Sequence, residues 1–179
     1  GWLAAHLRVH AGPNVIACRG LVLPLTDSPY NLLAPHYDLG EIAFDTWIDM
    51  EGNAGFDREA FARVGGYWNE NISGEGLDIS FRLAEEFPDS HIVYSPEPVI
   101  LHDYCLTVRK LATKIRRDAS GARSLAEREY ALRAYMRPLK ALRRKYRPRK
   151  PVSVAILSFA QRAFTRLLAF SLPRESPCR

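Results

Sequence analysis

The spacing of apolar residues in the first quarter of the chain predicts one helix and one strand region. A helix over residues 2–9 gathers its less polar side chains on one side: Trp2, Leu3, Ala5, His6 and Val9. Gly12-Pro13-Asn14 ends that helix. Residues 15–25 are rich in Val, Ile and Leu, which predicts a strand or a strand pair. Residues 26–40 have loop composition, and a loop of that length is typical of a functional or mobile segment.

The middle of the chain predicts two helices between short strands. A strand over residues 50–56 precedes Asp57, which is a good N-cap for a short helix over residues 58–64. Gly65-Gly66 ends this helix, with one glycine in the left-handed position. The apolar spacing predicts a longer helix over residues 77–87, and Pro88 stops it. Short strands at residues 91–94 and 99–101 follow.

The last third of the chain reads as mainly helical. The pattern is helical from Tyr104, with an interruption near Ser120-Gly121, and a long charged helix is expected over residues 125–146. Residues 147–151 form a hinge, and residues 152–172 form an amphipathic helix. We therefore expect an α/β domain over residues 1–122, a basic helix and hinge over 123–150, and an amphipathic helix and tail over 151–179.

Charge separates these parts more sharply than hydropathy does. Residues 1–108 hold five Lys/Arg and sixteen Asp/Glu, whereas residues 109–179 hold twenty Lys/Arg and four Asp/Glu. An acidic body suits a divalent metal or a polyhydroxyl acceptor, and a basic tail suits anionic lipid, nucleic acid or another protein. The chain has 179 residues and three widely spaced cysteines. That spacing argues against a disulfide framework and favours a reducing, cytoplasmic compartment.

Three sequence blocks carry a family resemblance. The first, from Gly52 to Tyr67, reads GNAGFDREAFARVGGY and continues into Trp68-Asn69-Glu70. The second, from Gly74 to Leu83, reads GEGLDISFRL, and the third, from Val93 to His102, reads VYSPEPVILH. In this order and spacing the blocks resemble the acceptor-side half of family-2-like and galactosyltransferase-like GT-A glycosyltransferases. The resemblance covers roughly residues 1–120 and implies a partial GT-A, Rossmann-like half-domain with short mixed strands.

The resemblance also implies roles for particular residues. Such enzymes transfer a hexose from a nucleotide sugar to a hydroxyl of a glycan or lipid-linked acceptor, in an inverting, metal-dependent reaction. Glu75 matches the first acid of the family's "ED" pair, Asp78 the later acid, and His102 the metal-binding histidine, with Mn²⁺ or Mg²⁺ as the cofactor of the complete enzyme. Residues expected at the substrate are Gly52 and Asn53, which shape the pocket floor, and Trp47 and Trp68, which can stack on a sugar.

Two departures from the family pattern leave an alternative open. Gly76 stands where the family's catalytic aspartate is usual, and the chain holds no Asp-x-Asp motif. We therefore expect the isolated chain to be inactive, because its nucleotide-binding half precedes Gly1 or lies elsewhere. The alternative is an inactive remnant or interaction module that keeps the half-domain fold. In that case Gly76→Asp restores no activity.

Each candidate residue also has a structural interpretation. Glu75 can be a favourable first-turn acid, Asp78 and Arg82 a surface pair, and His102 a loop histidine. Either tryptophan can be a core or rim residue. A further acidic group precedes the Gly52 turn and is either a solvated loop or a replacement for the missing metal site: Asp45, Asp49 and Glu51.

The tail has two readings of similar weight. Basic residues crowd residues 133–150, and residues 152–172 carry an apolar face. A basic run followed by an amphipathic helix is typical of a peripheral anchor on an anionic membrane surface, here through residues 133–172 at the inner face. The other reading packs the last helix on the body or on a partner. Aromatic interleaving is thin, which disfavours nucleic acid.

Overall fold

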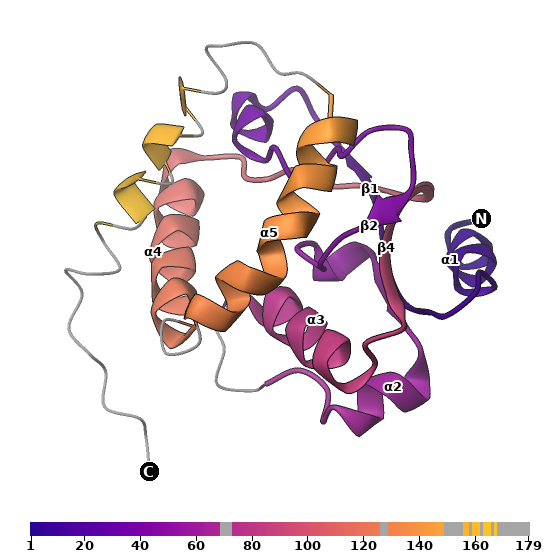
Figure 1. The fold of residues 1–179 in the computed structure, drawn as a ribbon. Coiled ribbons are helices and arrows are strands. Elements are labelled where there is room, and N and C mark those ends of the chain that lie inside the picture. The colour runs from indigo at the N-terminus through magenta and orange to yellow at the C-terminus, as the bar shows by residue number, and fades with distance from the viewer. Residues whose placement is uncertain are drawn as a thin grey trace.

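The computed structural model describes residues 1–68, 73–125, 129–148, 156–157, 159–161, 163–165 and 167. Figure 1 shows helices around a small sheet, which confirms the expected α/β class. The elements follow in the order α1 (Trp2–His10), β1 (Val15–Leu23), η1 (Pro29–Leu33), β2 (Phe44–Asp45), η2 (Glu51–Asn53), β3 (Ala54–Phe56), α2 (Arg58–Arg63), α3 (Glu75–Glu86), β4 (His91–Leu101), α4 (Val108–Ser124) and α5 (Glu129–Tyr146).

The sheet has four strands in the order β2-β4-β1-β3. The two central strands, β1 and β4, run parallel, and the outer strands β2 and β3 pair antiparallel with them. Residues 91–94 and 99–101 belong to one strand, because β4 stays paired with β1 on both sides of Pro96-Glu97-Pro98 with only a shift in register. The sequence predicted two strands there, since proline removes a ladder donor.

Neighbouring residues of β1 face opposite layers of the fold. Ala17 belongs to a buried cluster with Ile79 and Leu83 of α3. Cys18 lies 2.9 Å from the Nδ1 atom of His6 in α1. Figure 1 accordingly shows α1 on one side of the sheet and α3 and α5 on the other. Because successive side chains of a strand point to opposite faces of the sheet, β1 packs against α1 on one face and against α3 on the other.

The turn-helix-turn around α2 matches its sequence signals. The Asp57 carboxylate accepts a 2.8 Å hydrogen bond from the amide of Ala60, as an N-cap does. Gly65 and Gly66 both adopt positive φ angles, 78° and 67°, where a side chain is strained. Local sequence signals therefore suffice to predict this segment.

Tertiary contact overrides sequence signals at two other places. Residues 50–56, expected as one strand, divide into η2 and the three-residue β3, because the Asn53 side chain turns inward and is fully buried. Helix α4 runs through Ser120-Gly121 without the expected interruption. A Cβ atom on Gly121 would lie 2.2 Å from the carbonyl oxygen of Ser73, so this glycine permits close packing rather than a break.

The tail is described only in part. The helix expected over residues 125–146 is confirmed as α5 for Glu129–Tyr146. Of the expected hinge, residues 147–151, the part after Pro148 lies outside the described residues. Residues 156–157, 159–161, 163–165 and 167 are helical, and the rest of the predicted last helix lies outside the described residues. Among the residues that the structure describes, no helix is long and apolar enough to cross a membrane.

Candidate functional site

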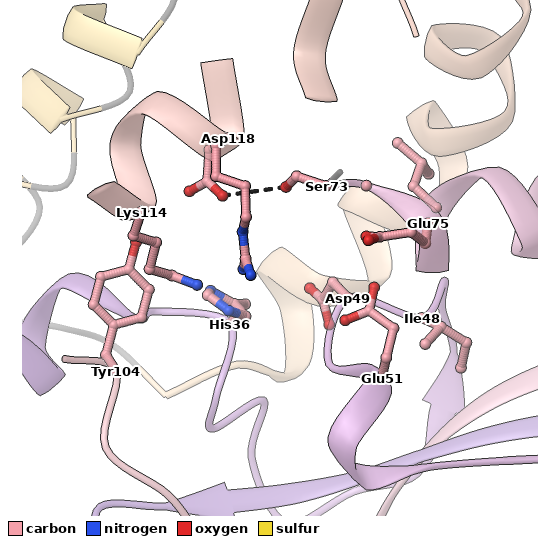
Figure 2. Close-up of a pocket in the computed structure, with 12 residues that line it drawn as sticks. His36, Ile48, Asp49, Glu51, Ser73, Glu75, Tyr104, Lys114 and Asp118 are labelled. Atoms are coloured by element: carbon pink, nitrogen blue, oxygen red, sulfur yellow. Dashed lines mark hydrogen bonds between the residues drawn. The ribbon is translucent and has the colours of Figure 1, made fainter. Parts of the chain in front are cut away.

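A cavity opens beside the first turn of α3. Its volume is about 220 Å³, and its walls come from the loop after η1, the segment after β2, the start of α3, the loop after β4, and α4. Figure 2 shows the side chains that line it. The polar ones are His36, Asp49, Glu51, Ser73, Glu75, Tyr104, Lys114, Arg117 and Asp118.

Glu75 is the first residue of α3, and its side chain lines the cavity. Gly74 precedes it with φ 89°, so a left-handed residue directs the chain into the helix. The Glu75 side chain has no hydrogen-bond partner among the residues that the structure describes. A negatively charged side chain in the first turn of a helix interacts favourably with the helix dipole, by about 0.3–1 kcal/mol. Glu75 is therefore an available base at the cavity wall.

Glu51 supplies a second carboxylate next to it. Its Oε1 atom accepts a 2.9 Å hydrogen bond from the backbone amide of Gly76, which is one of the unsatisfied donors of the first turn of α3. A Cβ atom on Gly76 would lie 2.5 Å from this Oε1 atom and 2.6 Å from the carbonyl oxygen of Ile48. The Glu51 carboxylate thus occupies space that an acidic side chain at position 76 would need.

Gly76→Asp is expected to destabilise the protein by about 2–3 kcal/mol, from overpacking against the Ile48 backbone and loss of the Glu51 hydrogen bond. Urea denaturation followed by circular dichroism measures this loss. Gly52→Ala is the matched control, because its Cβ atom would meet only the end of the Met50 side chain, at 3.4 Å. An unchanged stability of Gly76→Asp would contradict the packing described. Failure of this variant to gain activity consequently has a steric cause and does not favour the remnant alternative.

Asp49 lies at the centre of a buried charge network behind the cavity. Its Oδ1 atom is 3.2 Å from the Nε atom of Arg19, and its Oδ2 atom pairs with Arg143 of α5. The guanidinium of Arg143 also donates to the Thr46 hydroxyl at 2.6 Å and to the Trp47 carbonyl at 2.8 Å. Burial alone would raise the pKa of Asp49, but the two arginines outweigh it and lower that pKa to about 2. Asp49 is therefore ionised at neutral pH.

His36 is neutral at the cavity wall. Burial is the main cause that lowers the pKa of its imidazole to about 4; Asp49 opposes this shift, and the charges of Arg19 and Lys114 add to it. In the unfolded chain the ordinary value is about 6.5. The neutral ring can therefore either donate or accept a hydrogen bond at pH 7.

This shift predicts a loss of stability in mild acid. Because the folded pKa of His36 lies below the unfolded one, the unfolded state takes up the proton first, and stability falls as pH drops from about 6.5 to about 4. We expect a loss of about 2 kcal/mol after a discount for solvent contact. Urea denaturation at a series of pH values measures it, and His36→Gln should flatten the curve in this interval. The curve keeps some slope, since burial also lowers the pKa of His6. An identical slope in His36→Gln would refute the assignment.

Asp78 does not line the cavity. It is fully buried, and its Oδ2 atom accepts a 2.9 Å hydrogen bond from the Nε atom of Arg82 and forms an ion pair with the Nη2 atom at 2.8 Å. Arg82 in turn donates to the carbonyl oxygens of Val64 and Gly66. The Asp78–Arg82 pair, expected at the surface, instead connects the end of α2 to α3 inside the protein.

His102 lies beyond the end of β4, exposed and outside the cavity lining. Its Nδ1 atom is 2.9 Å from the hydroxyl of Tyr37. Within the described ranges no group of three or more His, Cys, Asp or Glu residues could hold a metal ion. The donor set around His102 does not fit a divalent cation, and Mn²⁺ or Mg²⁺ stays a prediction for the complete enzyme.

The residues expected at the substrate also lie away from the cavity lining. The Asn53 amide donates to the carbonyl oxygens of Leu21 and Pro98, at 2.8 and 3.0 Å, so it ties η2 to the central strands. Its neighbour Gly52 is exposed. The Trp47 ring is covered by the Arg143 guanidinium, 3.4 Å from the ring centroid, so that face cannot stack on a sugar. Trp68 is 42% exposed.

The α4 wall of the cavity was not predicted from the sequence. Lys114, Arg117 and Asp118 line the cavity, yet they fall in a helix that was expected only to be basic. Their i, i+3 and i+4 spacing places them on one helix face. That spacing was the available signal, but nothing in the sequence tells which helix face meets Glu75.

Comparisons of this chain with protein-family models, with curated proteins and with solved structures find no match. The functional interpretation therefore depends on the cavity geometry together with the sequence resemblance. Of the residues that the resemblance singled out, Glu75 is the one that lines the cavity.

Proposed function

We propose that this chain is the acceptor-side half of a GT-A-type glycosyltransferase, with Glu75 as the general base. The observation that carries the proposal is the place of the Glu75 carboxylate: it begins α3, lines the cavity and has no hydrogen-bond partner among the described residues. A base for sugar transfer must lie within hydrogen-bond reach of the acceptor hydroxyl, and a carboxylate without a protein partner is available for that contact.

The chemistry that these residues can perform is proton removal. An acceptor hydroxyl in the cavity donates to Glu75, and the carboxylate takes the proton as the oxygen attacks the sugar carbon of the donor. Glu51 stays on the Gly76 amide, so this backbone donor does not occupy the Glu75 carboxylate. The bond between the sugar carbon and the donor diphosphate breaks as the new bond forms, and the diphosphate departs with the bonding electron pair.

The size of the cavity supports an acceptor site. Its volume of about 220 Å³ lies below the roughly 300–1,000 Å³ of ordinary small-molecule sites, so it suits a sugar ring rather than an entire nucleotide sugar. The donor nucleotide would bind elsewhere, in agreement with the lack of an Asp-x-Asp motif.

A transfer assay tests the proposal. The assay contains labelled nucleotide sugars, a panel of glycan and lipid-linked acceptors, and Mn²⁺ or Mg²⁺. It is run with this chain alone and with a longer form of the protein that includes a nucleotide-binding half. We expect transfer in the second case. Absence of transfer and of donor hydrolysis across the common nucleotide sugars would overturn the proposal and leave the interaction module.

A second candidate function belongs to the tail: peripheral binding to an anionic membrane at the cytoplasmic face. Exposed basic side chains line α5, and exposed apolar side chains follow it: Arg137, Arg144, Lys145, Ile156, Phe159, Phe164 and Leu167. Co-sedimentation of the full chain with phosphatidylserine-containing and neutral vesicles tests this function. Binding only to the anionic vesicles, weakened by salt, is expected, and no binding would refute it.

A further inference from the structure

The cavity has one acidic wall and one basic wall. In Figure 2 the carboxylates of Asp49, Glu51 and Glu75 lie on one side, and Lys114 with His36 lies on the other. Arg117, one helical turn after Lys114 on α4, also lines the cavity. The proposed transfer uses only the acidic wall, so the basic wall needs its own explanation.

The two cations of this wall have no acidic partner in the part of the chain that the structure describes. Lys114 lies over the ring of Tyr104, with its ammonium 4.7 Å from the centroid. The Arg117 side chain makes no hydrogen bond or ion pair with a described residue. Asp118, which follows Arg117, accepts a 3.2 Å hydrogen bond from the Ser73 hydroxyl. The carboxylates of the cavity therefore leave the charges of Lys114 and Arg117 unpaired.

The buried network behind the cavity adds positive charge. Asp49 is shared between Arg19 and Arg143, so two guanidinium groups face one carboxylate there. Arg19 is 0% exposed, and its Nη1 atom has no hydrogen-bond partner among the described residues. Asp38 acts on Arg19 more weakly than Asp49 does. A buried excess of positive charge is costly, and an anion in the adjoining cavity would offset it.

We infer that the cavity binds a phosphorylated, hydroxyl-bearing ligand of the sugar phosphate class, with its phosphate on Lys114 and Arg117 and a hydroxyl on the Glu75 side. Guanidinium groups bind phosphate oxygens in a bidentate manner, and ammonium groups bind them as point charges. Carboxylates accept hydrogen bonds from sugar hydroxyls. The assignment of the acceptor hydroxyl to Glu75 rests on the proposed function, whereas the phosphate site does not.

Isothermal titration calorimetry on the full chain tests the inference. The probes are glucose 1-phosphate, glucose, inorganic phosphate and uridine diphosphate. We expect glucose 1-phosphate to bind more tightly than glucose or phosphate alone. Arg117→Ala and Lys114→Ala should each weaken this binding about tenfold or more, as the loss of a charged hydrogen bond does. Arg116→Ala is the matched control, because Arg116 is exposed on the same helix and does not line the cavity.

The outcomes separate the sources of the phosphate. Binding of glucose 1-phosphate that depends on Lys114 and Arg117 supports a phosphorylated acceptor. Binding of uridine diphosphate alone, with the same dependence, supports the phosphate site and assigns it to the donor diphosphate. Binding of no phosphorylated probe, or binding that neither variant weakens, overturns the inference. Phosphate binding without sugar transfer would remove the proposed function alone, and transfer that Arg117→Ala leaves intact would remove this inference alone.

Discussion

Glu75→Gln is expected to lower the rate of sugar transfer by about 100- to 10,000-fold, which is the usual contribution of a general base. The amide keeps the size of the carboxylate but cannot take a proton at neutral pH. The Glu75 side chain makes no hydrogen bond with a described residue, so this substitution should leave the fold intact. The loss should therefore appear in kcat, with a small change in the KM for the acceptor.

The measurement compares transfer rates of the wild type and the variant over a range of pH, each in the longer form that shows transfer. Glu85→Gln is the matched control, because Glu85 is an exposed acid on the same helix and lies outside the cavity lining. Its rate should equal that of the wild type. Equal rates for Glu75→Gln and the wild type would remove Glu75 from the reaction, and Glu51→Gln would then test the other carboxylate of this wall.

Arg143→Ala is expected to destabilise the protein by about 3–5 kcal/mol, the usual cost of removing one partner from a buried ion pair. The substitution removes the pairing with Asp49 and the hydrogen bonds to Thr46 and Trp47, and it uncovers the Trp47 ring. Arg19 would keep a contact with Asp49, but the Oδ2 atom would lose its described partner. The segment from Thr46 to Glu51 should loosen, and with it the acidic wall of the cavity.

Urea denaturation of Arg143→Ala measures this cost, and two variants sharpen the result. Arg144→Ala should change stability by less than about 0.5 kcal/mol, because Arg144 is exposed. Arg143→Lys keeps the charge, but a lysine cannot reach Thr46, Asp49 and the Trp47 carbonyl together, so it should recover only a minor part of the loss. Equal stability of Arg143→Ala and Arg144→Ala would show that the network does not hold α5 to the body.

Position 76 shows how the structure changes the meaning of a sequence departure. In the sequence, a glycine in place of the family's aspartate weakens the case for an enzyme. In the structure, Glu51 reaches the same place from η2 and binds the Gly76 amide. The cavity therefore keeps a second carboxylate, that of Glu51, although position 76 is a glycine. The remnant alternative therefore loses the observation that most favoured it.

Local chemistry in the sequence determined much of the fold. Asp57, the Gly65-Gly66 pair and the apolar spacing of α3 act within one turn or one helix, so each could be predicted without knowledge of the rest of the chain. The α/β class and the position of Glu75 at a helix start follow from the same kind of signal. The resemblance to glycosyltransferases added a role for Glu75, and that role stays a prediction.

Only the tertiary structure decided what surrounds Glu75. Arg143 pairs with Asp49 across 94 positions of sequence, and Lys114 faces an acidic wall built from η2 and α3. In the sequence, Gly76 indicated a lost acid and Gly121 indicated a helix break. In the structure, both glycines permit close backbone contacts that a side chain would prevent. Sequence spacing reports which residues share a helix face, but the partner of that face depends on packing between distant segments. For this reason the sequence located the base of the proposed reaction, and the fold alone revealed the cavity around it.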